Sequence, residues 1–329
     1  MSKGRTLKVF LVDGAPNGLL TAEIMNWTGH VITGPRSRLS ELIQRPEAQR
    51  TAVYFLVGPD LGAGIGTKVY IGETDDAARR LVAHNRPEDK GGKDFWERVC
   101  VVTSKDANLT KGHIKYLESR LLATAKAAGR CELLNGTEPE YNSLPEADRS
   151  DMAFFLDQIH TLLPVLGYDF LRSKTKAATP PGEAAPGLEP QAVSPIFVRE
   201  VKRHGVRARG QEVDGEFLVF KGGIARRAWT GNETTYGKLF LHLATTGVLK
   251  PTADDQHTEF TEDYAFASPS AAAAIVAGRS SNGRTAWVIE GTNTNYGEWQ
   301  SEQVNKVAPA QPAPEPPTVV PAMAEDGEA

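Results

Sequence analysis

Cysteine is scarce in this chain, and long apolar runs are missing. The only two cysteines, Cys100 and Cys131, have no metal-ligand spacing around them and give no basis for a disulfide. The first apolar run, residues 9–12, is too short for a signal peptide or a membrane-spanning helix. We therefore expect a reduced, cytoplasmic protein without a membrane partner.

The chain also lacks a strong net charge. Its formal charge is −4, but residues 307–329 contain four acidic side chains and no lysine or arginine. The rest of the chain is close to neutral, so any surface that binds phosphate groups must be a local basic patch. Bulk charge neither requires nor excludes a nucleic-acid partner.

The 329 residues are enough for about two domains. Residues 173–195 are rich in Ala, Pro, Gly and Glu with scarcely any large apolar residue, which predicts a flexible linker. Residues 306–329 form a Pro/Ala-rich acidic tail that we expect to be disordered. The remaining segments are predicted to be an N-terminal extension over 1–49, a first domain with a trailing helix over 50–172, and a small α+β domain over 196–305.

The first domain has an α/β pattern that brings four polar side chains together. Two expected strands, residues 52–57 and 68–73, precede an expected helix over 75–85. Tyr54 and Tyr70 face the same side of such a hairpin, so two phenols can share one pocket.

The expected helix adds a basic pair to this pocket. Arg80 and His84 are one turn apart and lie on one helix face, whereas Arg79 is turned away. The planar fork of an arginine is well suited to phosphate oxygens. This layout indicates a site that cuts a phosphodiester bond.

Two tripeptides mark the strands of this hairpin: Ala-Val-Tyr at residues 52–54 and Tyr-Ile-Gly at residues 70–72. With Arg80 and His84, they resemble the GIY-YIG endonuclease superfamily, with Ala and Val in place of the first Gly and Ile. The family pattern continues with a glutamate in a later helix and an asparagine beyond it. In this chain those positions are Glu118 and Asn135.

The resemblance covers roughly residues 50–137 and implies an α/β fold, with a small mixed or antiparallel sheet flanked by helices. It also implies hydrolysis of DNA phosphodiester bonds with one divalent cation, Mg²⁺ or Mn²⁺. Glu118 would be the protein ligand of that metal. A single carboxylate agrees with the preference of a hard cation for oxygen, since water and a phosphate oxygen can fill the other positions.

The resemblance also implies roles for the remaining residues. Tyr70 would act as the general base, and Arg80 would stabilise the phenolate and the negative charge of the transition state. Tyr54 and His84 would orient these groups or relay the proton. Asn135 would hold the site together by hydrogen bonding.

Each of these side chains also has an ordinary structural interpretation. A tyrosine at the end of a strand commonly packs half-buried, Arg80 can lie on a solvated helix face, and Glu118 can pair with Lys115 one turn earlier. A fold does not by itself establish an activity. The alternative is therefore a catalytically inactive nucleic-acid-binding or regulatory protein on the same fold.

The second domain contains a basic segment over residues 199–209. Its candidate nucleic-acid-binding residues are Lys202, Arg203, Arg207 and Arg209. Such a cluster suits phosphate contact, although a solvated face is equally common.

A later stretch of this domain, residues 268–287, has a Ser-Pro-Ser cap before an alanine-rich helix, an Asn-Gly turn and Trp287. It resembles an uncharacterised domain that often follows GIY-YIG nuclease domains in bacterial proteins. We expect this domain to help choose the nucleic-acid target. The alternative is a structural or protein-binding module in which Trp287 belongs to the core.

Overall fold

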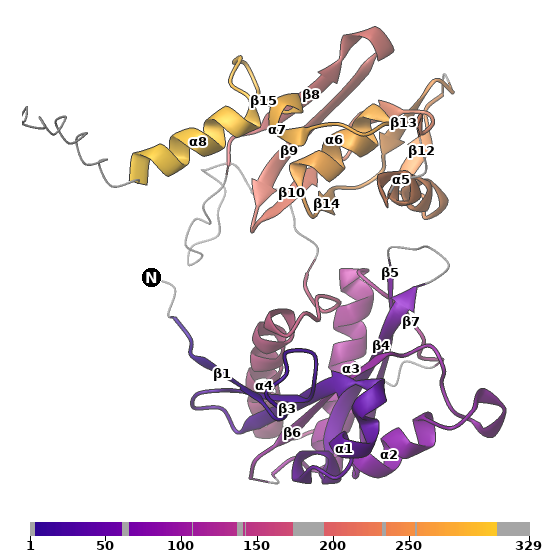
Figure 1. Cartoon of the computed structure of the whole chain (residues 1–329), viewed down its shortest axis with the longest axis vertical. Coiled ribbons are helices and arrows are strands. Elements are labelled where there is room, and N and C mark those ends of the chain that lie inside the picture. Colours follow the sequence, from indigo (N-terminus) through magenta and orange to yellow (C-terminus); the bar gives the residue numbers. More distant parts are fainter. Residues whose placement is uncertain are drawn as a thin grey trace, which may run out of the picture.

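The computed structural model describes residues 4–60, 66–106, 108–136, 141, 143–173, 194–231, 235–253 and 255–307. The chain forms two α/β units, each with its own hydrophobic core (Figure 1). Most of the predicted linker and of the predicted tail lies outside the described residues. Within the ranges given above, no helix combines the length and hydropathy of a membrane span.

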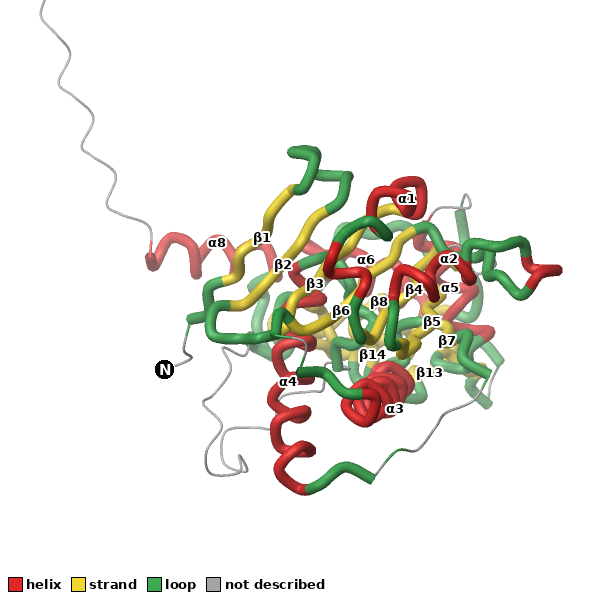
Figure 2. Tube along the Cα trace, turned by 90° about the horizontal axis from the view of Figure 1, so that it is seen from below, coloured by secondary structure: helices red, strands yellow, loops and turns green. Residues whose placement is uncertain are grey.

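A seven-stranded sheet lies at the centre of the first unit, in the order β1-β2-β3-β6-β4-β5-β7 (Figure 2). Its strands are β1 (Leu7–Leu11), β2 (Leu20–Ile24), β3 (Gly29–Pro35), β4 (Ala52–Asp60), β5 (Gly66–Thr74), β6 (Arg98–Ser104) and β7 (Glu132–Leu133). All neighbouring strands are antiparallel except β5 and β7, which are parallel. The segment expected as an N-terminal extension supplies β1, β2 and β3 to this sheet through the pairing of β3 with β6.

Helices cover both faces of this sheet. They are α1 (Leu39–Leu42), α2 (Ala77–His84), α3 (Lys111–Ala128) and α4 (Glu146–Val165), with short 3-10 turns at Arg36–Arg38, Pro46–Gln49 and Glu88–Lys90. In Figure 2, α3 and α4 lie on one side of the strands, and α1 and α2 lie on the other. The mixed α/β architecture with largely antiparallel strands agrees with the predicted fold class at this level.

The apolar run of β4 explains why the sheet is covered on both faces. Val53 and Phe55 belong to the core beneath α3 and α4, while Tyr54 and Leu56 belong to the core beneath α1 and α2. A strand buried on both faces has no alternation of polar and apolar residues. The tyrosine of the first tripeptide therefore points toward α2.

The second unit contains a five-stranded sheet in the order β14-β10-β9-β8-β15 and a three-stranded sheet in the order β11-β13-β12. The strands are β8 (Phe197–Val201), β9 (Val206–Val213), β10 (Glu216–Val219), β11 (Ile224–Arg226), β12 (Leu249–Pro251), β13 (His257–Phe260), β14 (Tyr264–Phe266) and β15 (Val288–Ile289). Its helices are α5 (Thr235–Thr245), α6 (Pro269–Ala277), α7 (Gly283–Ala286) and α8 (Tyr296–Val307), with a 3-10 turn at Lys202–His204.

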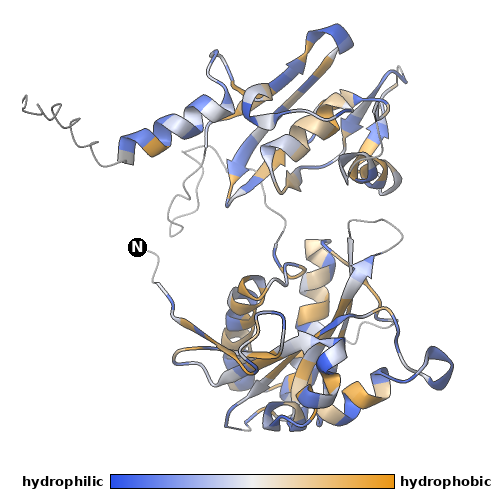
Figure 3. Ribbon diagram, viewed as in Figure 1, coloured by the Kyte–Doolittle hydropathy of each residue, from blue (hydrophilic) through white to orange (hydrophobic). Residues whose placement is uncertain are grey.

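Helix α6 is the centre of the second unit's core. Its alanines, Ile275 and Val276 are all buried, and Figure 3 colours much of the α6 ribbon as hydrophobic. Ser268 caps its first turn by accepting from the Ala271 N–H, as the Ser-Pro-Ser sequence predicts. Trp287 is fully buried and donates from Nε1 to the Pro269 carbonyl at 2.9 Å. Trp287 is thus a core residue.

Two arginines link the units: Arg172 Nη2 donates to the Asp214 carbonyl at 2.9 Å, and Arg130 contacts Glu216. Arg130, which follows α3, donates from Nη1 and Nη2 to the two carboxylate oxygens of Glu216 on β10, both at 2.8 Å. Its Nε donates to the Arg172 carbonyl at 2.9 Å. A forked contact of this kind fixes direction as well as distance.

Candidate functional site

The β4–β5 hairpin places the two phenols of the tripeptides side by side. Tyr54 lies opposite Gly72, and Tyr70 lies opposite Leu56, so both side chains face α2. Their ring centroids are 6.2 Å apart. A Cβ at Gly72 would lie 2.4 Å from the Tyr54 hydroxyl oxygen. Glycine is therefore required in the second tripeptide for the first tyrosine to fit.

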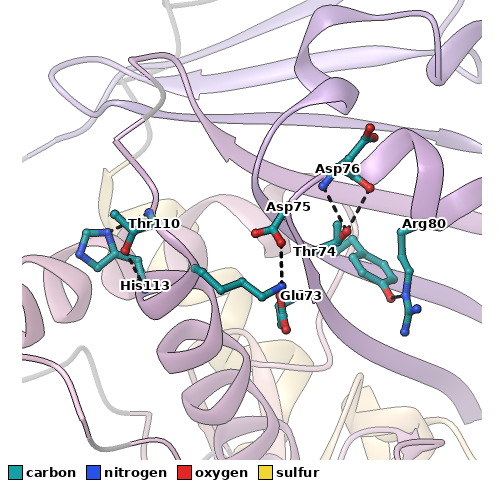
Figure 4. A network of polar contacts seen from close by, with 9 residues as sticks. Glu73, Thr74, Asp75, Asp76, Arg80, Thr110 and His113 are labelled. Carbon is teal, nitrogen blue, oxygen red and sulfur yellow. Dashed lines mark hydrogen bonds and ion pairs between the residues drawn. The ribbon is translucent and has the colours of Figure 1, made fainter.

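Helix α2 brings the basic pair to the phenols. Asp76 caps its first turn by accepting from the Arg79 N–H at 2.9 Å, and Thr74 bonds to Asp76 in turn (Figure 4). One turn apart, Arg80 and His84 both reach Tyr54. Arg80 Nε donates to the Tyr54 hydroxyl oxygen at 3.2 Å, and His84 Nε2 lies 2.7 Å from the same oxygen. Arg80 and His84 therefore lie on one face of α2, as predicted, and both contact the Tyr54 hydroxyl.

Burial decides the protonation of this group. Tyr54 is completely buried, which raises the pKa of its phenol, although the nearby Arg80 acts in the opposite direction. Burial, with the charges of Arg80 and Lys93, lowers the pKa of His84 to about 4. His84 is therefore neutral at pH 7, and one of its ring nitrogens can accept a proton. Tyr70 is only partly buried, and the Lys93 ammonium lies 4.2 Å from its ring centroid.

Glu118 comes from the opposite face of the sheet. Helix α3 starts at a capping box in which Thr110 and His113 bond to each other's backbone N–H (Figure 4). Leu117 and Leu121 anchor the helix in the core, while Glu118 is half-buried beside β5. Burial, followed by the charge of Glu73, raises the pKa of the Glu118 carboxyl to about 7.

The surroundings of Glu118 connect it to the phenol pocket. The positive charges of Lys111 and Arg80 lower the pKa of its carboxyl, in opposition to burial. A hydrogen bond from the Glu73 backbone lowers this pKa as well. Lys111 Nζ itself lies 2.6 Å from Glu73 and 3.2 Å from Asp75. Within the described ranges Glu118 forms no ion pair with Lys115, so the ordinary interpretation as a helix-surface pair is wrong.

Asn135 fastens the strand that carries Tyr70. Its side-chain oxygen accepts from the Ile71 N–H at 3.1 Å, and its side-chain nitrogen donates to the Ile71 carbonyl at 2.7 Å. The pairing of β5 with β7 ends at Val69 and Leu133. The Asn135 side chain thus bonds to the backbone of β5 at Ile71, where β7 no longer pairs with it.

Oxygen donors for a divalent cation are few at this site. Among the described residues no three His, Cys, Asp or Glu side chains gather as a metal-binding group. Glu118 is the carboxylate without a lysine partner, whereas neighbouring Glu73 is engaged by Lys111. One carboxylate with water as the remaining ligands fits Mg²⁺ or Mn²⁺ and does not fit a closed zinc site.

The predicted basic segment of the second unit is divided by the strand geometry. Arg207 and Arg209 lie on the exposed face of β9, at 3.8 and 2.8 Å from the carboxylate oxygens of Glu290. Lys202 and Arg203 lie exposed in the 3-10 turn between β8 and β9. The four predicted residues therefore do not form one unpaired patch.

The sequence interpretation missed several charged neighbours. Glu73, Lys93 and Lys111 contact the candidate site from β5, a loop and α3, and only Glu73 lies next to a motif. In the second unit, Arg279 lies near Arg199 of the predicted basic segment, although it follows 80 residues later in the sequence. No periodicity could have indicated these contacts, because they depend on how the strands and helices pack.

Comparison with known proteins identifies part of the second unit. Residues 198–300 match the family model of DUF4357, a domain of unknown function. The prediction of an uncharacterised domain in the C-terminal part of the chain is thereby confirmed. Searches of curated proteins and of solved structures gave no significant match.

Proposed function

We propose that the first unit is a metal-dependent endonuclease of the GIY-YIG type, which hydrolyses phosphodiester bonds of DNA. The observation that carries this proposal is the convergence of two phenols, Arg80 and His84 near the end of β5 with a half-buried carboxyl from α3. These groups supply a base, a cation for the phosphate and an oxygen ligand for a metal.

Tyr70 is the group that takes the proton from the attacking water. It is partly exposed, whereas Tyr54 is completely buried and out of reach of solvent. The Arg80 guanidinium and the Lys93 ammonium place positive charge next to Tyr70. Tyr54 and neutral His84 hold the pocket through their 2.7 Å contact and keep Arg80 directed at it.

Arg80 stabilises the charge that develops on the phosphate. Arg80 is an exposed residue whose Nε bonds to Tyr54, so a phosphate group in solvent can reach its guanidinium. Fixed donors of this kind stabilise a transition state by several kcal/mol, because no reorganisation is required during the reaction.

Glu118 is the residue that would hold the divalent cation. A bound Mg²⁺ or Mn²⁺ would polarise the phosphate and neutralise negative charge. Its carboxyl must lose a proton first, and the lysine that neutralises Glu73 keeps a second carboxylate from competing.

Nicking of supercoiled plasmid and of branched DNA in Mg²⁺ or Mn²⁺ tests this function. We expect Arg80→Ala to slow cleavage by about 100-fold or more, whereas Arg79→Ala, an exposed neighbour on the same helix, leaves the rate within about twofold. Equal rates for these two variants would refute the role of Arg80. No metal-dependent cleavage by the wild type on any substrate would favour the inactive nucleic-acid-binding protein.

The two tyrosines are separated by a second pair of variants. Tyr70→Phe removes the proposed base and should reduce cleavage by about 100-fold or more. Tyr54→Phe removes only the hydroxyl that holds His84 and Arg80, and should cause a smaller loss. A larger loss in Tyr54→Phe would assign the base to Tyr54.

A further inference from the structure

Three arginines meet at the C-terminal end of α6 in the second unit. Arg226, the last residue of β11, packs against Gly278, because a Cβ there would lie 2.9 Å from Arg226 Cβ. Arg279 follows Gly278 directly, and its charge acts on Arg199 of β8. The Arg199 guanidinium approaches the Ala286 carbonyl and the Ser281 hydroxyl, both at 3.5 Å.

The 3-10 turn after β8 extends this cluster. His204 is exposed, and the arginines 203, 226 and 279 all act on it and contribute to the lowering of its pKa, after desolvation. Arg199 lies on the face of β8 that carries Phe197, which is opposite to the face of Arg207 and Arg209 on the paired strand. The cluster is therefore separate from the basic residues that pair with Glu290.

The charges of this cluster are not balanced by acids. Among the described residues, no carboxylate forms an ion pair with Arg199, Arg226 or Arg279, whereas Arg227 pairs with Asp255 at 2.9 Å. Arg199 Nε is buried without a hydrogen-bond partner. Burial, with the charge of Arg279, lowers the pKa of Arg199.

The dipole of α6 does not account for this cluster. A helix C-terminus carries about half a negative charge, which one cation would offset. Three guanidinium groups and the neighbouring Arg203 exceed that charge severalfold. Their arrangement costs free energy in the absence of an anion, because like charges repel and a buried donor lacks an acceptor.

We propose that Arg199, Arg226 and Arg279 form a site for the phosphodiester backbone of nucleic acid. The inference rests on the proposed function only in its choice of nucleic acid as the source of phosphate. Arg199 forms the inner wall and supplies positive charge there, and Arg226 and Arg279 hold the phosphate oxygens at the rim. Exposed Arg203 and His204 continue the site along the backbone, which suits a polymer better than a single phosphate.

DNA affinity measured against salt concentration tests the site. Fluorescence anisotropy with a labelled duplex, in EDTA to prevent cleavage, would compare the full-length wild type with the double variant Arg226→Gln/Arg279→Gln. Arg279 is exposed and Arg226 is partly buried, and circular dichroism would verify that the double variant folds. We expect the salt slope of log K to fall by about 2 and the affinity by about tenfold or more at low salt.

The matched control is Arg207→Gln/Arg209→Gln, which removes the same charge from arginines that already pair with Glu290. This control should change the salt slope of log K by less than half as much as Arg226→Gln/Arg279→Gln does. An equal change in both double variants, or no DNA binding by the wild type, overturns the inference. The inference is also overturned if Arg226→Gln/Arg279→Gln loses binding of inorganic phosphate but keeps the wild-type salt slope for DNA. In that case the site binds a free anion and not nucleic acid.

Failure of this site and failure of the nuclease are distinguishable. Plasmid nicking by a wild type whose salt slope does not respond to Arg226→Gln/Arg279→Gln would overturn only the site. A reduced salt slope in that variant, together with no nicking by the wild type, would support the site and overturn only the nuclease.

Discussion

The carboxyl of Glu118 gives the most quantitative prediction. Its pKa in the folded protein is about 7, compared with an ordinary value of 4.5, because the group is half-buried and lies near Glu73. At pH 4 the carboxyl is protonated in both the folded and unfolded states. As the pH rises from 4.5 to about 7, the unfolded chain loses this proton while the folded protein still holds it, so stability falls over this interval and is constant above it.

The difference between 4.5 and about 7 corresponds to about 3 kcal/mol for a group fully shielded from water. Because Glu118 is only half-buried, solvent screening reduces the expected effect to about 1–2 kcal/mol. Glu118→Gln, which has nearly the shape of the protonated carboxyl, should therefore be more stable than the wild type by this amount at pH 8.5. At pH 5 the two proteins should be about equal.

Urea denaturation in EDTA, followed by circular dichroism at pH 5 and pH 8.5, measures this difference. The second unit is identical in both proteins, so its contribution cancels. Addition of Mg²⁺ at pH 8.5 should stabilise the wild type and leave Glu118→Gln unchanged, because metal binding needs the ionised carboxylate. A stability difference that is the same at both pH values would refute the reasoning about burial and Glu73.

Two further predictions concern contacts that hold the site and the units in place. Asn135→Ala removes both hydrogen bonds to the Ile71 backbone and should lower the free energy of unfolding by about 2 kcal/mol. The rate of hydrogen exchange at the Ile71 N–H should increase. An unchanged exchange rate would contradict the role of Asn135 in holding β5. Arg130→Ala removes both 2.8 Å hydrogen bonds to the buried Glu216 carboxylate and should cost about 2–3 kcal/mol. Hydrogen exchange in β10 should be faster in Arg130→Ala than in the wild type, and it should be unchanged in the exposed control Lys126→Ala. Unchanged exchange in Arg130→Ala would contradict this prediction.

Local patterns were sufficient to predict the elements that carry the motifs. The hairpin and the helix with Arg80 and His84 follow from the period of the apolar residues and from helix capping. The alanine-rich helix predicted after the Ser-Pro-Ser cap is α6. Each of these signals is contained within a few neighbouring residues.

The relation between distant segments could not be predicted in this way. The pairing of β3 with β6 makes the expected extension part of the central sheet, and no local feature of residues 1–49 specifies that partner. Arg207 and Arg209 of the basic segment pair with Glu290, some 80 residues later, and no local feature of that segment indicates this partner. Arg226 and Arg279 meet only because β11 packs at the end of α6.

The central claim is that Glu118 from one face of the sheet and the phenol pocket from the other form one metal-dependent site. Nicking of supercoiled plasmid in Mg²⁺ by wild type, Glu118→Gln and the exposed control Glu97→Gln tests it most directly. We predict metal-dependent nicking by the wild type and Glu97→Gln, and none by Glu118→Gln. Undiminished nicking by Glu118→Gln would contradict the account.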